Sequence, residues 1–388
     1  MAKLLSKEEV KAFGSIKELR DFNNLQEMTY NWVEFDTVDG EYVPLEDNPI
    51  CIPVIRDDLH ISEDVTDETI SDQMADTKLA LKYPTGDELK CYPVGPTAYR
   101  GVLERVGGTC PALTSLKETR ARNEVSPTDK AAICNMLTKY TKGKSLLLVG
   151  DELVLADLSS DYVRLPFSEI LDITENELGE KFEYVRYVRG TVSHESSSAE
   201  FIFQDDEIDS NLLDAFSKIG IDTSDYNAHI KVLTSDVGLS GANIYPFIRS
   251  EKTGNQISIG TPIKLEHIGN ADMDKFKANL LSCFSSFVEC SEHLDAMSNI
   301  KIHNPADTLY NIGHKVGLPE KLIKEAYEDF DNEFSFTCKG TDVYVKLFDI
   351  LDSYISDEEV SDIRQMQLNE NITRICFYSL SKYDMPAI

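Results

Sequence analysis

The sequence has few basic residues for its length. Of its 388 residues, 68 are Asp or Glu and only 38 are Lys or Arg, which gives a formal net charge of −30 at pH 7. Nucleic-acid phosphates repel such a chain unless its bases gather on one face. The composition therefore excludes a general polyanion binder. The excess acid could instead imitate a nucleic acid or keep the protein soluble.

Long apolar runs are also missing. No stretch of about 18 apolar residues occurs, so we predict no membrane-spanning helix. The opening residues, MAKLLSKEEVKAF, lack the apolar segment of a signal peptide. The eight cysteines are scattered without a CxxC pair, a pattern typical of buried, reduced thiols. We therefore expect a cytoplasmic protein with no membrane partner.

The common catalytic motifs are absent as well. The chain has no GxxxxGK[ST] loop, no GxGxxG after a strand, no HExxH and no GxSxG. We therefore predict no catalytic residue, no metal and no cofactor. Cys110, in the loop RVGGTCPAL, has no His near it in sequence, so we favour a plain loop over a reactive thiol.

Two groups of residues keep a metal site open as a hypothesis. One could form a zinc set: Cys283, Cys290, His293 and His303. Its two cysteines fall on an apolar helical stripe, which favours core packing. The other is a set of acids around a predicted hairpin: Asp151, Glu152, Asp157 and Asp161. Such acids usually occupy turns and caps, but a carboxylate-metal enzyme remains an alternative.

Charge and turn signals divide the chain into three regions. Residues 1–90 predict an acidic helical arm, and the stretch 57–76 holds eight acids and no Lys or Arg. Residues 91–300 mix strands with helices, and residues 301–388 are mostly helical and acidic. We predict an α+β fold with helices packed on a central antiparallel sheet.

The strand signals lie between residues 145 and 265. SLLLVGDELVL predicts a hairpin that turns at Gly150-Asp151. Alternating residues in 181–204 predict a second hairpin, and further strands are predicted within 228–237 and 242–265. Ser126, followed by Pro127, predicts the start of a helix.

A long helix is predicted over residues 272–298. Its apolar residues recur at alternating intervals of three and four. This spacing is typical of a helix packed on the preceding sheet or of a subunit seam in a homo-oligomer. The seam would consist of Phe276, Leu280, Phe287 and Leu294.

Residues 100–144 have a net charge opposite in sign to that of the whole chain. They hold nine bases and four acids, which gives +5. Neighbouring tyrosines could stack on nucleobases. The alternative is a solvated face that pairs with the acidic arm. The residues predicted to bind nucleic acid are Arg100, Arg105, Lys117, Arg120, Arg122, Lys142 and Lys144.

The stretch LVLADLSSDYVRLPFSEILDI, residues 153–173, reads as a strand, a polar loop and a helix. Alone it predicts a structural corner, in which Tyr162 lies at the sheet rim with a free hydroxyl. It also resembles the signature of phage and plasmid proteins classed as domain of unknown function 932. The aligned motif residues are Ser160, Asp161, Tyr162, Arg164, Leu165 and Pro166.

Two more segments carry this resemblance, which covers roughly residues 85–300. They are YPVGPTAYRGVLERVGGTCPAL and LTSDVGLSGANIYPFI, the second with Ser235 and Gly238. The family's basic residue between the Asp and the Tyr is missing, because Asp161 and Tyr162 are adjacent. The resemblance implies a mobile-element protein in a host cytoplasm and brings no defined activity.

The order of strands and helices from residue 145 is similar to that of Rad52-like single-strand annealing proteins, apart from the insert at 205–227 and extra strands at 242–265. This resemblance implies an oligomer that binds or anneals single-stranded DNA. Of Arg186 and Arg189, at most one would contribute to the DNA-binding groove, because the period-two alternation of a strand places their side chains on opposite faces of the sheet. The alternative is an acidic inhibitor of a host defence system, binding a basic host protein through 57–76, 205–214 or 349–362.

Overall fold

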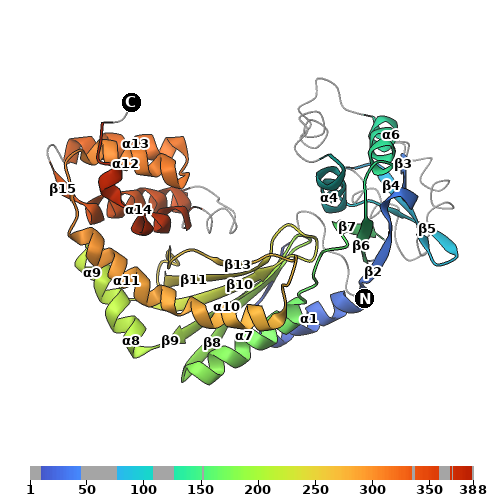
Figure 1. Cartoon of the computed structure of the whole chain (residues 1–388). Coiled ribbons are helices and arrows are strands. Elements are labelled where there is room, and N and C mark those ends of the chain that lie inside the picture. Colours follow the sequence, from blue (N-terminus) through green and yellow to red (C-terminus); the bar gives the residue numbers. More distant parts are fainter. Residues whose placement is uncertain are drawn as a thin grey trace.

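The computed structural model describes residues 10–44, 77–107, 126–150, 153–333, 337–357, 368 and 370–386, and at a few of these, Arg105 among them, the backbone alone. The described chain forms three parts: a small unit of short strands and helices, a seven-stranded sheet with helices along it, and a C-terminal group of helices (Figure 1). The predicted α+β class and central antiparallel sheet are confirmed.

Every strand pair of the large sheet is antiparallel. The order is β1-β8-β9-β10-β11-β12, and β13 pairs with β11 beside β12. The predicted second hairpin is formed by β8 and β9. The strand bounds are β1 Lys11–Phe13, β8 Tyr184–Val192, β9 Ser197–Gln204, β10 Tyr226–Thr234, β11 Ala242–Ser250, β12 Gln256–Ser258 and β13 Ile263–Leu265.

Helices cover one face of this sheet (Figure 1). They are α1 Ile16–Thr29, α7 Phe167–Lys181, α10 Met273–Cys283 and α11 Ser285–Ser298. In α7, Phe167, Ile170 and Leu171 are buried at helical spacing. They share one core with Phe201 and Phe203 of β9. Between β9 and β10 lie α8 Asp206–Ile208, a π-helical turn Asp209–Leu213 and α9 Asp214–Lys218.

The helix predicted over 272–298 is interrupted at Phe284, between α10 and α11. The four predicted seam residues are Phe276, Leu280, Phe287 and Leu294, and each is at most 1 % exposed. They belong to the chain's own core, so they cannot also contact a second copy. The subunit-seam prediction is therefore wrong, and packing on the sheet is the interpretation that holds.

Two three-stranded sheets build the small unit, in the orders β2-β6-β7 and β3-β4-β5. Gly150 still pairs with Leu153, so it belongs to the strand and the prediction that it forms the turn is wrong; Asp151 lies outside the described residues. The Ser126 hydroxyl accepts from the backbone nitrogen of Asp129, which confirms the predicted cap. The bounds are β2 Asn31–Asp36, β3 Glu41–Pro44, β4 Leu79–Thr85, β5 Glu88–Pro93, α4 Pro96–Gly107, α6 Pro127–Thr138, β6 Lys144–Gly150 and β7 Leu153–Ser159.

The prediction that residues 1–90 form a helical arm holds for α1 and is wrong for most of the other described parts, which form strands. Strand β1 joins the large sheet through β8, and β2 joins the small unit through β6. The reason is strand pairing: NWVEFD and LALKYPT carry β-formers that pack on neighbouring strands whatever the charge of the region. The acidic stretch 57–76 lies outside the described residues.

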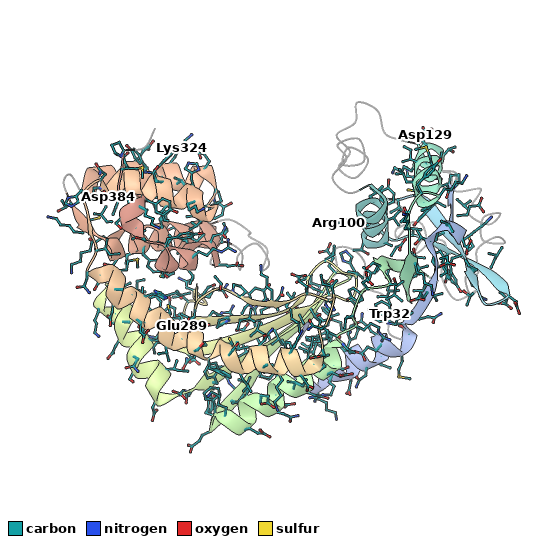
Figure 2. The ribbon with its side chains drawn as sticks, in the orientation of Figure 1. Trp32, Arg100, Asp129, Glu289, Lys324 and Asp384 are labelled. Atoms are coloured by element: carbon teal, nitrogen blue, oxygen red, sulfur yellow. The ribbon has the colours of Figure 1, made fainter. Side chains whose placement is uncertain are left out.

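The described C-terminal region is helical, as predicted. Asp384 accepts from the backbone nitrogens of His303 and Asn304, just before α12, and so ties the chain end to this group (Figure 2). No helix within the described ranges is both long and apolar enough to cross a membrane. The bounds are β14 Lys301–Ile302, α12 Pro305–Val316, α13 Glu320–Glu333, β15 Cys338–Lys339 and α14 Gly340–Asp357.

The contact between α1 and the sheet is tested at Gly190. A Cβ there would lie 2.5 Å from Leu19 Cδ2 and 2.6 Å from the Tyr187 hydroxyl. We expect Gly190→Ala to lower the free energy of unfolding by about 1–3 kcal/mol in urea titration. Gly179→Ala is the matched control. Gly179 lies in α7 with no neighbouring heavy atom within 4 Å, so the same change should stabilise by about 0.5–1 kcal/mol. Equal effects at both sites would contradict the packing.

Candidate functional site

The face of the large sheet turned away from the helices is polar. Glu200 on β9 pairs with Lys231 on β10, and Lys231 pairs with Tyr245 on β11. Directly paired residues point to the same face of an antiparallel sheet. His229 lies two residues from Lys231 and Arg249 lies four residues from Tyr245, so both side chains share the face of this row. We call this face, with its side chains from β8 to β13, the polar face.

A bulge in β8 places both of its arginines on the polar face. Arg189 pairs with Glu200 and Arg186 pairs with Ile202, with a register shift between Tyr187 and Arg189. Glu200 and Ile202 are two residues apart and so lie on one face. The prediction that Arg186 and Arg189 face opposite ways is therefore wrong, because an extra residue in the strand resets the alternation.

Glu200 is the buried centre of the polar face. Its Oε1 lies 2.5 Å from the Arg249 guanidinium and 2.9 Å from His229 Nδ1, and its Oε2 lies 3.0 Å from Arg189 Nε. Arg249 also donates to Gln256 Oε1 over 2.9 Å. Burial alone would raise the pKa of Glu200, but the close His229 and the charges of Arg249 and Arg189 lower it to about 2. The carboxylate is thus held ionised.

The rim of the polar face is open to solvent. The side chains of Arg186, Arg189 and Lys264 are 58 %, 42 % and 48 % exposed. Tyr184, two residues before Arg186, is also exposed. The strands place five bases on this face, Arg186, Arg189, Lys231, Arg249 and Lys264, against one acid, Glu200.

The C-terminal segment borders this face at its far edge. Thr373 donates to the carbonyl of Ser258 over 2.7 Å. Glu370 lies 4.0 Å from Lys264 and is bonded by Arg374. The nearest acid to Lys264 therefore already has a closer cationic partner.

The motif residues meet at the joint between the small unit and the large sheet. The Tyr162 ring stacks on His267 at 4.8 Å and on Trp32 at 5.9 Å between centroids. The Arg164 guanidinium lies 4.8 Å from the centre of the Trp32 ring. Figure 2 shows Trp32 at this joint. Four side chains from three separate segments thus form one continuous stack.

Hydrogen bonds close the same joint. The Tyr162 hydroxyl donates to the carbonyl of Ser235 over 3.0 Å, so the predicted free hydroxyl is wrong. His267 Nδ1 lies 2.9 Å from the Val163 carbonyl, which only accepts, so Nδ1 carries the proton. Its Nε2 then accepts from Thr234, 3.0 Å away. Withdrawal from water lowers the pKa of His267, which keeps the ring neutral.

Ser235 and Gly238 complete the joint from the loop after β10. The Ser235 hydroxyl donates to the Glu195 carbonyl over 2.6 Å and accepts from the nitrogen of Leu239. Gly238 has φ +76°, and a Cβ there would lie 2.6 Å from Leu158 on β7. Only glycine satisfies both conditions. Of the other motif residues, Ser160 and Asp161 are exposed and Pro166 precedes α7.

A small hollow lies beside the stack, lined by Glu27, Tyr30, Trp32, Arg164, Pro166 and Asp236. Its volume is about 10 Å³, roughly the space of one water. Withdrawal from water and the charge of Glu27 raise the pKa of Asp236 to about 6, against the opposing charge of Arg164. The joint therefore holds a titratable carboxyl but has no room for a larger ligand.

The structure describes four of the seven residues of the predicted basic island, on α4 and at the start of β6. Arg100 is exposed on α4 (Figure 2), and Arg105 lies on the same helix. Lys144, at the start of β6, lies 2.6 Å from Glu34, and Lys142 is exposed just before it. Lys117, Arg120 and Arg122 lie outside the described residues. Of the bases on the polar face, only Arg186 and Arg189 were singled out from the sequence. The others could not be recognised from local patterns, because they lie on separate strands that only the folded sheet brings together.

The two residue sets that were kept open as metal sites do not assemble within the described ranges. There, no group of three or more His, Cys, Asp or Glu residues could hold an ion. Asp157 is buried and accepts from the Tyr42 hydroxyl over 3.2 Å. Cys283 and Cys290 are core residues, and burial raises the pKa of each to about 12. Their thiols therefore remain protonated, as packing residues. Asp151, Glu152 and Cys110 lie outside the described residues.

Comparison of the chain with models of protein families, with curated proteins and with solved structures finds no match. The family resemblance thus rests on the motifs alone.

The charge cluster is tested by Glu200→Gln. Removing this carboxylate leaves Arg189, Arg249 and His229 facing one another, which should lower the free energy of unfolding by about 3–5 kcal/mol at pH 7. The exposed Glu169→Gln on α7 is the control and should change the free energy of unfolding by less than about 0.5 kcal/mol.

The contribution of Glu200 to stability also depends on pH. Because the folded pKa of Glu200 lies below that of the unfolded chain, the stabilisation is present above about pH 4.5 and is lost as pH falls towards 2. If Glu200→Gln lowered the free energy of unfolding by less than about 1 kcal/mol at pH 7, the charge cluster would not be needed for stability.

Asp236 predicts the opposite pH dependence. The folded protein holds its proton more tightly than the unfolded chain, so its contribution to stability is full below about pH 4 and is lost as pH rises through 6. Asp236→Asn mimics the protonated form and should be more stable than the parent by roughly 1–2 kcal/mol at pH 8. Asp161→Asn, on the exposed part of the motif, should leave stability unchanged. Urea titrations at pH 5 and pH 8 decide, and a destabilised Asp236→Asn at pH 8 would contradict the assignment.

Proposed function

We propose that the chain binds single-stranded DNA across the polar face of its large sheet. The supporting observation is the charge that the strands place on that face: five bases against one acid in a chain whose net charge is −30. Two further acids lie at the rim, Glu251 at 3.9 Å from Arg186 and Glu370 at 4.0 Å from Lys264. Such an island attracts phosphates while the rest of the surface repels them. Binding then has one available orientation, with the strand on the face away from the helices.

The helices show the complementary charge. The four helices that cover the sheet carry twelve acids and five bases, and most of the acids lie on α7 and α11. Because these helices cover the opposite face, charge is segregated across the thickness of the sheet. A solubility device alone would not need such segregation, since spreading the acids evenly serves it equally well.

The rim also offers contacts that suit unpaired bases. Tyr184 is exposed beside Arg186 on the polar face. Stacking of bases on aromatic rings tolerates any sequence, and arginine binds the phosphate between them. Annealing of two strands would require a second copy of the chain, and the seam residues cannot supply that contact. The proposal is therefore limited to binding by the single chain.

The acidic helices favour one alternative, an inhibitor that binds a basic host protein. Of the segments predicted for it, 57–76 lies outside the described residues, and 205–214 forms α8 and the turn after it. The segment 349–362 is described only to residue 357, where α14 ends. The two functions use different residues, so charge reversal on the polar face separates them.

The test is binding of a fluorescent single-stranded oligonucleotide at low salt. Arg186→Glu combined with Lys264→Glu should weaken binding by ~10-fold or more, since two phosphate contacts become repulsive. Lys277→Glu is the matched control. Lys277 is 47 % exposed on α10 and pairs with Glu177, on the other face, so its reversal should weaken binding less than ~2-fold. No binding by the parent protein at low salt, or equal losses in both variants, would refute the proposal and favour the acidic-inhibitor alternative.

A further inference from the structure

A second concave site lies in the small unit, where its two sheets meet. The hollow has a volume of about 280 Å³. It is lined by Thr29, Asn31, Tyr83, Thr85, Lys90, Tyr92 and Val149. These residues come from the end of α1 and from four strands, so the fold of the whole unit shapes the hollow.

Strand registers explain why these side chains converge. Tyr83 pairs with Lys90 in the hairpin β4–β5, and Thr85 and Tyr92 follow at period two. Asn31 pairs with Val149 across β2 and β6. The two pairs thus line the hollow from two different sheets, one contributing rings and an ammonium and the other an amide.

The walls combine a fixed aromatic surface with one cation. Tyr83 is buried, and its ring stacks on that of Phe35 with 5.7 Å between centroids. The centroid of the Tyr92 ring lies 6.2 Å from that of Tyr83, at an interplanar angle of 44°. Lys90 Nζ lies 3.2 Å from Glu88. That pair is partly solvent-exposed, so a phosphate can displace the carboxylate at little cost.

The residues that line the hollow favour a ligand of negative charge. No acid is among the seven lining residues, although the chain has 68 Asp and Glu residues. The polar groups are one ammonium, one amide and two threonine hydroxyls, all able to donate hydrogen bonds. An anionic group is therefore favoured beside Lys90, and a flat ring beside the tyrosines.

Size limits the ligand further. Pockets for drug-sized ligands span roughly 300–1,000 Å³, so a hollow of 280 Å³ admits one ring system with a small group and excludes a dinucleotide. We propose that this hollow binds a nucleoside monophosphate, with its base against Tyr92 and its phosphate on Lys90. The hollow belongs to a different unit from the polar face, so this proposal does not depend on the proposed DNA binding.

The test titrates the full-length protein with deoxyadenosine monophosphate by calorimetry. Saturable binding is expected. Deoxyadenosine, which lacks the phosphate, and ribose 5-phosphate, which lacks the base, should each bind ~10-fold more weakly or worse. No saturation by ~5 mM monophosphate, or tighter binding of ribose 5-phosphate than of the nucleotide, would overturn the proposal.

Two variants locate the site. Lys90→Ala should weaken binding of the monophosphate by ~10-fold, and Lys90→Arg should restore most of it because the charge is kept. Lys82→Ala is the matched control: Lys82 pairs with Cys91 on the other face of the same hairpin, and its loss should weaken binding less than ~2-fold. Equal losses in Lys90→Ala and Lys82→Ala, with unchanged melting temperatures, would place the binding elsewhere.

Competition then identifies the source of the nucleotide. A 5′-phosphorylated oligonucleotide that displaces the monophosphate, when its 5′-hydroxyl form does not, identifies the end of a strand. If neither displaces it, the ligand is a free nucleotide. The oligonucleotides are added to the Arg186→Glu, Lys264→Glu protein, so that binding to the polar face does not contribute.

Discussion

The carboxylate of Glu200 is the charge on which the polar face depends. Arg189 of β8, His229 of β10 and Arg249 of β11 converge on it, and its side chain is 1 % exposed. Withdrawing such groups from water is costly, and only their mutual attraction and hydrogen bonds offset the cost. The cluster also specifies register, because a slip of one residue in any of these strands would turn its charge into the apolar core on the helix side.

This constraint makes the sheet two-sided. The face of the sheet towards the helices has to be apolar, because α7 and α10 pack on it. The basic side chains of the strands therefore lie on the opposite face. The acids are confined in the same way to the solvent side of the helices. A net charge of −30 is therefore compatible with a cationic surface, because the sheet keeps the two populations apart. Net charge alone does not decide whether such a chain can bind nucleic acid.

Local patterns predicted the hairpins, the Ser126 cap and the α+β class, since each depends on a few neighbouring residues. What depends on distant partners could not be predicted. Period two places Arg186 and Arg189 on opposite faces, and only pairing with Glu200 and Ile202 reveals the bulge between them. The apolar stripe of 272–298 suits a seam or a sheet equally well. The acidity of residues 1–90 concealed strands whose partners lie more than a hundred residues away.

The motif at 160–166 shows how a recognisable signature can be mainly architectural. Tyr162 is enclosed by Trp32, His267 and the Ser235 carbonyl, so its ring and its hydroxyl are both occupied. Gly238 is fixed by the approach of Leu158. These residues orient the small unit on the large sheet, and with it the hollow around Lys90 and Tyr92. The motif thus joins the two units through Tyr162 and Arg164, while Ser160 and Asp161 stay exposed, and the two proposed binding surfaces, the polar face and the hollow, are placed by the joint that it forms.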